Sequence, residues 1–89
     1  MTDVPPHIRK MAHDRQFKVT IRIGRSGLSD AMYEELDAQL SSRKVVKVKM
    51  NKGLIEERAD RKAVFEEIAE RVNAILVDAR GNVAIYWRS

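Results

Sequence analysis

The sequence predicts an α/β fold in two layers, with the element order α-β-α-β-α-β-β and a four-stranded mixed sheet packed against helices. Residues 17–23 and 45–50 alternate apolar and polar side chains, which is typical of half-buried strands. Each stretch is followed by an apolar stripe of helical period. Strand–helix–strand units of this kind join parallel strands by right-handed crossovers, and a predicted C-terminal hairpin adds an antiparallel pair.

The first elements are a short helix and a strand. Residues 1–6 are expected to form a frayed tail, and residues 8–15 a helix of about two turns. In the strand at 17–23, four apolar side chains face one way and three polar ones the other. These are Phe17, Val19, Ile21 and Ile23 against Lys18, Thr20 and Arg22.

The second helix and strand follow a glycine loop. Ser29 is a good N-cap, and Asp30 lies in the first turn, where the helix dipole favours a carboxylate. The helix is predicted to end at about Ser42, with an apolar face of Met32, Tyr33, Leu36 and Leu40. In the strand at 45–50, Val46, Val48 and Met50 point inward and Lys47 and Lys49 outward.

The C-terminal part predicts one more helix and the hairpin. Residues 57–73 carry an apolar stripe of Val64, Phe65, Ile68, Ala69 and Val72. Strands at 75–79 and 83–87 flank Gly81-Asn82, a pair suited to a tight turn. Because residues 83–87 are apolar on both faces, they are predicted to form a central strand.

Composition limits the function classes. A chain of 89 residues predicts one domain over 1–89, and the absence of cysteine excludes disulfides and thiolate zinc sites. No apolar stretch approaches the roughly 18 residues of a membrane span, so we expect a cytoplasmic protein. His7 and His13 do not have the spacing of a helical metal pair, and no cofactor is expected.

No carboxylates form a pair with an assignable acid–base role, so neither catalysis nor a small-molecule substrate is predicted. The glutamates are interpreted as exposed helix charge: Glu34, Glu35, Glu56, Glu57, Glu66, Glu67 and Glu70.

The positive charge is unevenly distributed. The net charge is +4 and the sequence pI about 9.7. Residues 1–53 carry 11 Lys and Arg against six Asp and Glu, whereas residues 54–89 carry six against seven. Residues 15–27 and 43–53 contain no acid at all. Clustered positive charge attracts polyanions, because each neutralised phosphate releases condensed counterions. A solvated basic surface without a partner would have the same composition.

The motif with the clearest chemistry is Gly24-Arg25-Ser26-Gly27, between a strand and a capped helix. The two glycines let the backbone turn sharply and approach a ligand closely. The N–H groups that begin the next helix favour an anion, and the Arg25 guanidinium suits a phosphate. G-x-x-G alone is a common turn, but basic strands flank this one. The spacing matches neither a P-loop nor a dinucleotide-binding loop.

Over nearly its whole length, the chain resembles the CRM, or YhbY-like, RNA-binding domain family. The stretches that carry the resemblance are residues 8–13 (IRKMAH), 19–29 (VTIRIGRSGLS), 43–49 (RKVVKVK) and 81–88 (GNVAIYWR). Two departures are visible. Pro5-Pro6 stand where members often have more basic helical sequence, and Arg25 replaces the more usual loop lysine.

The resemblance implies a fold like the C-terminal domain of bacterial translation initiation factor three, in which a four-stranded mixed sheet packs against two principal helices. It also implies RNA binding through the glycine loop, as in KH domains, whose loop clamps about four nucleotides of backbone. Stand-alone members are associated with ribosome precursors. We therefore expect a stand-alone, single-domain protein that binds ribosomal RNA or a pre-ribosomal particle.

The predicted RNA-binding residues are the loop and the basic side chains near it: Gly24, Arg25, Ser26, Gly27, Arg22, Lys18, Lys47, Lys49, Lys44 and Lys52. The lysines could instead form an ordinary solvated surface. Tyr86 and Trp87 could stack on bases. Trp87, however, shares a strand face with Val83 and Ile85, which favours core packing.

The function hypothesis is non-catalytic binding of structured RNA in ribosome subunit assembly, with the RNA backbone clamped at residues 24–27. The alternative is a protein-interaction module that docks on a ribosomal protein or assembly factor and depends on an exposed apolar patch. Membrane binding is disfavoured because no amphipathic helix has a basic polar face.

Overall fold

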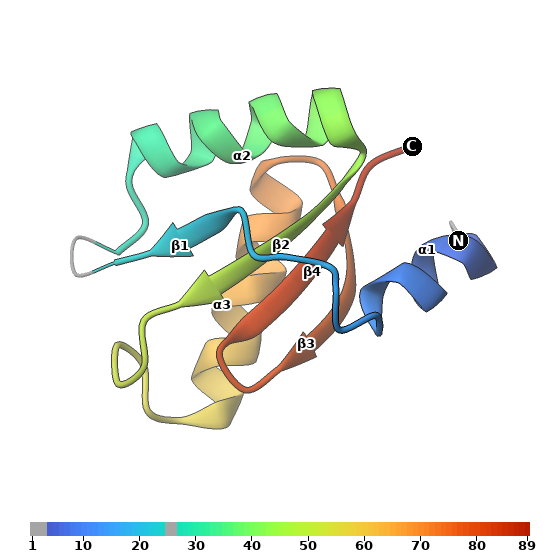
Figure 1. The fold of residues 1–89 in the computed structure, drawn as a ribbon. Helices are drawn as coiled ribbons and strands as arrows, with labels where there is room; N and C mark the ends of the chain where they lie inside the picture. The colour runs from blue at the N-terminus through green and yellow to red at the C-terminus, as the bar shows by residue number, and fades with distance from the viewer. Residues whose placement is uncertain (1–3, 25–26) are drawn as a thin grey trace.

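The computed structural model describes residues 4–24 and 27–89 and shows an α/β fold (Figure 1). The elements are α1 (Pro6–Ala12), β1 (Ile21–Ile23), α2 (Asp30–Arg43), β2 (Val45–Met50), α3 (Arg58–Arg71), β3 (Ile75–Arg80) and β4 (Val83–Trp87). The sheet order is β1-β2-β4-β3, with β1 parallel to β2 and the other two pairs antiparallel. The predicted fold class and element order are confirmed.

The main core lies between the sheet and the two long helices. Leu36 and Leu40 of α2, Ile68 of α3 and Val48 of β2 are completely buried there. The Ser29 hydroxyl accepts a hydrogen bond from the Met32 N–H at 3.1 Å, as expected for an N-cap. The α2–β2 junction is tight because Lys44 adopts a left-handed conformation, with φ of 71°.

The hairpin also agrees with the sequence. Gly81 has a positive φ of 54°, which a turn between two strands commonly requires. The strand β4 lies between β2 and β3, so the run that is apolar on both faces is central, as predicted. Tyr86 is completely buried and its hydroxyl donates to the Phe65 carbonyl at 2.8 Å, which removes its ring from the surface.

The helix α1 covers part of the opposite sheet face. Ile8 and Ala12 of α1 form a second cluster with Val45 and Ile85, and Trp87 packs partly buried against it. Trp87 is therefore a packing residue, as interpreted from the sequence. Val4 is also buried in this cluster and Pro6 begins α1, so the expected frayed tail at 1–6 is wrong for residues 4–6. Residues 1–3 lie outside the described residues.

The first strand is shorter than predicted. The ladder begins at Ile21, although the Thr20 N–H still donates to the Lys47 carbonyl at 3.1 Å. Phe17 packs against the second cluster, on the sheet face opposite to Ile21 and Ile23. The alternation across 17–23 therefore predicts the wrong sheet face for Phe17. The chain turns here to pass from α1 to β1, and the Phe17 N–H donates to the Asp14 carbonyl in this turn.

Candidate nucleic-acid interface

The glycine loop joins the end of β1 to the start of α2. The Gly27 N–H donates to the Gly24 carbonyl at 2.9 Å, which closes a four-residue turn. Gly27 has a φ of 69°, a conformation that side chains with a Cβ disfavour. The two glycines therefore bound a tight turn, and Gly27 is the one whose backbone conformation favours glycine. Arg25 and Ser26 lie outside the described residues, and their contact with a ligand stays a prediction.

Two other chain reversals lie beside the glycine loop. The Asn51 N–H donates to the Ile23 carbonyl at 2.9 Å, and the Met50 N–H donates to the Asn82 carbonyl at 2.7 Å. The end of β1, the end of β2 and the β3–β4 turn thus meet at one end of the sheet, to the left and below in Figure 1. We call this the loop end. The exposed Lys52 follows Asn51 at this end of the sheet, and its contact with RNA stays a prediction.

A row of basic side chains crosses the open sheet face at the loop end. Arg22 is paired with Lys49, Lys49 with Val83, and Val83 with Arg80. Residues directly opposite one another on paired strands share a face, so these side chains lie side by side. Arg22, Lys49 and Arg80 are all exposed, and we call them the basic row. The row places Arg22 and Lys49 beside the glycine loop and Arg80 on the far edge strand, β3, at the same end of the sheet.

Arg80 was missed in the sequence analysis. It comes directly before the predicted Gly81-Asn82 turn, so counting the hairpin register back from the turn would have placed it opposite Val83. Its guanidinium lies 3.6 Å from the Asp78 carboxylate, but the Arg80 side chain is 79% exposed. The Asp78 side chain is only 28% exposed, but a 3.6 Å ion pair with an exposed arginine contributes little and leaves the Arg80 guanidinium accessible to a phosphate.

The remaining predicted lysines are placed differently. Lys47 is half-buried, and its ammonium donates to the Phe17 carbonyl at 3.0 Å and lies 6.0 Å from the Phe17 ring centre. It is partly committed to holding the segment before β1. Lys18 precedes β1, and Lys44 precedes β2, so both lie at the sheet end opposite to the glycine loop. Six strand residues span roughly 20 Å, so Lys44 is well separated from Gly24.

In the part of the chain that the structure describes, no three His, Asp or Glu side chains gather in a way that could hold a metal ion. No described helix is long and apolar enough to cross a bilayer. The large apolar side chains that are exposed among the described residues are Met11, on α1, and Leu28, beside the glycine loop.

The family model of the CRS1/YhbY (CRM) domain matches residues 6–88. The chain belongs to this family. It is 28% identical over 71 residues to the Pseudomonas aeruginosa protein PA4753, which is named as a probable RNA-binding protein. That alignment covers 80% of this chain and 65% of the relative, so the chain spans just under two thirds of the relative's length.

A solved structure shares the fold. The solution structure of the Staphylococcus aureus protein SAV1595, described as a candidate RNA-binding protein, matches with a TM-score of 0.75 at 25% identity. The match covers 93% of this chain and 81% of that one. The CRM family expected from the residues is therefore confirmed.

Proposed function

We propose that this chain is a non-catalytic RNA-binding protein that holds the RNA backbone at the glycine loop and the basic row. The family membership supports this, as do the names of the Pseudomonas relative and the Staphylococcus neighbour. The observation that carries the proposal is the meeting of Gly24 and Gly27 with Arg22, Lys49 and Arg80 at one end of the sheet.

The arrangement suits phosphate rather than base edges. The glycines leave the backbone open to close approach, and Arg25 adds a fork of donors of the kind that binds phosphate. Lysine and arginine side chains along the row extend the contact to neighbouring phosphates. Such binding depends on RNA backbone shape and charge, and it predicts weak sequence preference.

The partner we propose is ribosomal RNA, or a pre-ribosomal particle, in the cytoplasm. This choice rests on the association of stand-alone family members with ribosome precursors. It is tested by sucrose-gradient sedimentation of cell extract. Co-migration with precursor particles rather than with mature subunits supports the assembly role, and absence from all ribosomal fractions contradicts it.

The loop contact is tested by measuring affinity for a labelled RNA hairpin from about 50 to 200 mM salt. The variant Arg25→Asp, Ser26→Asp is expected to bind about tenfold more weakly or worse, with a shallower salt slope, because it removes one cation and adds two anions. The matched control is Ser42→Asp, Arg43→Asp, the same exchange at exposed positions at the opposite sheet end. Circular dichroism checks that both variants fold.

The outcomes separate the alternatives. Weaker RNA binding by the loop variant alone supports a phosphate contact at the loop. An equal loss of RNA affinity in the loop variant and the control variant would show only a general dependence on charge. If the unchanged chain ignores RNA at low salt, the protein-interaction module becomes the better explanation. Among the described residues, the exposed large apolar side chains at which such docking is tested first are Met11 on α1 and Leu28 beside the glycine loop.

A further inference from the structure

A basic hollow lies between the start of α3 and the β3–β4 turn. Its volume is about 400 Å³. Four of its seven lining residues are cationic: Arg58, Arg61, Lys62 and Arg80, alongside Phe65, Ala79 and Gly81. We call it the α3 hollow. Its size lies within the range of small-ligand sites in proteins.

The charge in the α3 hollow is largely unneutralised. No acid lines it, although Glu56, Glu57 and Asp60 are close in sequence. Among the residues that the structure describes, no carboxylate forms an ion pair with Arg58, Arg61 or Lys62. Arg80 is paired with Asp78, which does not line the hollow. The other three cations repel one another, so the site is best occupied by an anion.

Arg61 is held in position by the backbone. Its Nε–H donates to the Gly81 carbonyl at 3.2 Å, and Nη1 donates to the Ile55 and Glu56 carbonyls at 3.0 and 2.8 Å. Of the five N–H donors of a guanidinium, these bonds use three. None of the described residues accepts a hydrogen bond from Nη2, so a fixed cation with two spare donors borders the hollow. A cation held in place in advance loses little freedom when it binds a phosphate.

The hollow offers charge but no exposed aromatic ring among the described residues. Phe65 is only 1% exposed, so its ring cannot receive a base. The other uncharged contributors, Ala79 and Gly81, present a methyl group and backbone. Nucleobases stack in RNA-binding proteins mostly on exposed aromatic rings. The exposed planar groups in this lining are guanidinium groups, which also form forked contacts with phosphate. The lining therefore suits a sugar–phosphate backbone.

The α3 hollow also lies at the loop end of the sheet. Gly81 lines it, and the neighbouring Asn82 accepts a hydrogen bond from Met50, next to Asn51 beside the glycine loop. Arg80 belongs both to the hollow and to the basic row. Since β1 and β4 flank β2, and adjacent strands are about 4.8 Å apart, roughly 10 Å separates their ends. A few nucleotides of one RNA strand can cross this distance.

We infer that the α3 hollow binds a second phosphate segment of the same RNA, so that the backbone is held both at the glycine loop and beside the β3–β4 turn. This inference rests on the proposed function. It adds Arg58, Arg61 and Lys62 to the interface, none of which belongs to the basic stretches of the first half of the chain.

The test is the double variant Arg58→Gln, Lys62→Gln, titrated with the labelled RNA hairpin across the same salt series. Arg61 is left unchanged because it supports the surrounding loops. Loss of two phosphate contacts is expected to make the salt slope shallower by about 1.4 to 1.8. The matched control is Arg9→Gln, Lys10→Gln, which removes two exposed charges from α1. Thermal unfolding checks that both variants remain folded.

A second readout is local. In NMR titrations of the unchanged chain with the hairpin, the Gly81 amide and the Arg61 Nε–H resonances are expected to shift. A smaller slope for the hollow variant only, together with these shifts, supports the inference. The inference is overturned if the hollow variant has the same salt slope as the unchanged chain, or if the control variant shows an equal decrease in slope. Neither result affects the proposed contact at the glycine loop. If the unchanged chain does not bind RNA, the proposed function itself fails.

Discussion

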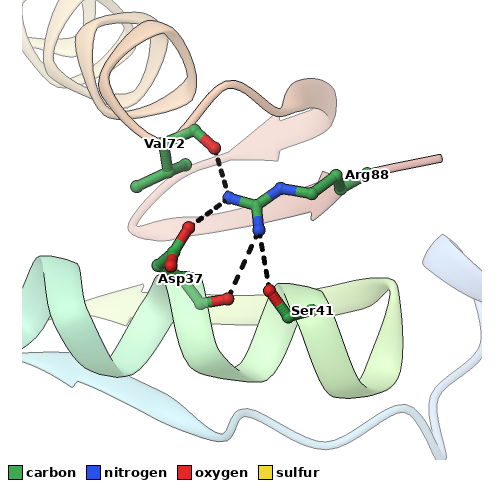
Figure 2. Close-up of polar contacts among 4 residues, drawn as sticks. All are labelled: Asp37, Ser41, Val72 and Arg88. Carbon is green, nitrogen blue, oxygen red and sulfur yellow. Dashed lines mark hydrogen bonds and ion pairs between the residues drawn. The ribbon is translucent and has the colours of Figure 1, made fainter.

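At the scale of single residues, Arg88 makes the densest set of polar contacts in the structure (Figure 2). Its guanidinium lies 2.7 Å from the Asp37 carboxylate and 3.1 Å from the Ser41 hydroxyl, and it also donates to the Val72 carbonyl. Asp37 and Ser41 belong to α2, while Val72 is the C-cap of α3. A residue just past β4 thus ties together the two helices that cover the main core.

We predict that Arg88→Met lowers the free energy of unfolding by about 2 kcal/mol, because the Val72 carbonyl and the α2 side chains lose a charged donor that is only 19% exposed. Asp37→Asn should cost less, since the Asp37 side chain is 62% exposed and the other Arg88 contacts remain. Urea denaturation of both variants measures the difference. Equal costs would show that the Asp37 pair alone accounts for the contribution of Arg88.

At the scale of elements, Tyr86 fastens the central strand to α3. Burial raises the pKa of its hydroxyl above the ordinary value for tyrosine, because the phenolate cannot be solvated in the core. The pKa of Tyr33 is also raised, mainly by burial, although the Arg71 guanidinium 4.4 Å from its ring opposes the shift. Both tyrosines stay protonated in the folded protein over the neutral range.

The raised pKa of Tyr86 predicts a loss of stability at high pH. Below about pH 10 the tyrosine is neutral in both folded and unfolded chains, and its contribution is complete. Above that pH only the unfolded chain releases the proton, so stability falls by up to about 1.4 kcal/mol per pH unit. Tyr86→Phe should be less stable at pH 7 by about 1 kcal/mol, through loss of the bond to Phe65.

The same variant should show a smaller decline with rising pH. Urea denaturation of both proteins at neutral pH and above pH 10 gives the comparison. Parallel declines would mean that other groups govern the alkaline transition.

The elements that the sequence predicts well are those in which one local signal dominates. Alternation in 45–50 gave the bounds of β2, and the Ser29 cap placed the start of α2. The misplaced residue, Phe17, belongs to a connection between two faces of the sheet. In this connection Phe17 packs in the second cluster rather than in the main core. Alternation of apolar and polar residues does not indicate on which side of the sheet such a side chain packs. Tyr86 was undecided for a related reason, since its strand is apolar on both faces.

The candidate site was only partly predictable. Proximity in sequence and clustered charge identified Arg22 and Lys49, because β1 and β2 are both basic and their ends meet. Segment charge does not point to the cations of the α3 hollow, because residues 54–89 carry six basic and seven acidic residues and are nearly neutral. Arg58, Arg61 and Lys62 are spaced i, i+3 and i+4, so one helix face gathers them, and the intervening Asp60 does not line the hollow. The net charge of a whole segment does not reveal a basic face on one helix, because acids on its other faces cancel the charge in the sum.

At the scale of the whole molecule, the fold divides the predicted lysines and arginines between two ends of the sheet. Arg22 and Lys49 lie at the loop end, in register with each other, whereas Lys18 and Lys44 precede β1 and β2 at the opposite end. All four side chains are exposed, so burial gives no reason to separate them. The position of the glycine loop separates the two pairs, because an RNA backbone held at the loop lies closer to Arg22 and Lys49 than to Lys18 and Lys44.

This division gives a comparison in which each variant controls for the other. Arg22→Gln, Lys49→Gln and Lys18→Gln, Lys44→Gln both remove two exposed charges and leave the core intact. Measured with the labelled hairpin across the salt series, the first pair is expected to reduce the salt slope by about 1.4 to 1.8, since each lost phosphate contact removes about 0.7 to 0.9. The second should leave the slope within error of the unchanged chain. A larger effect from Lys18 and Lys44 would instead place the RNA across the sheet, toward the C-terminal end of α2, and would reject an interface centred on the loop end.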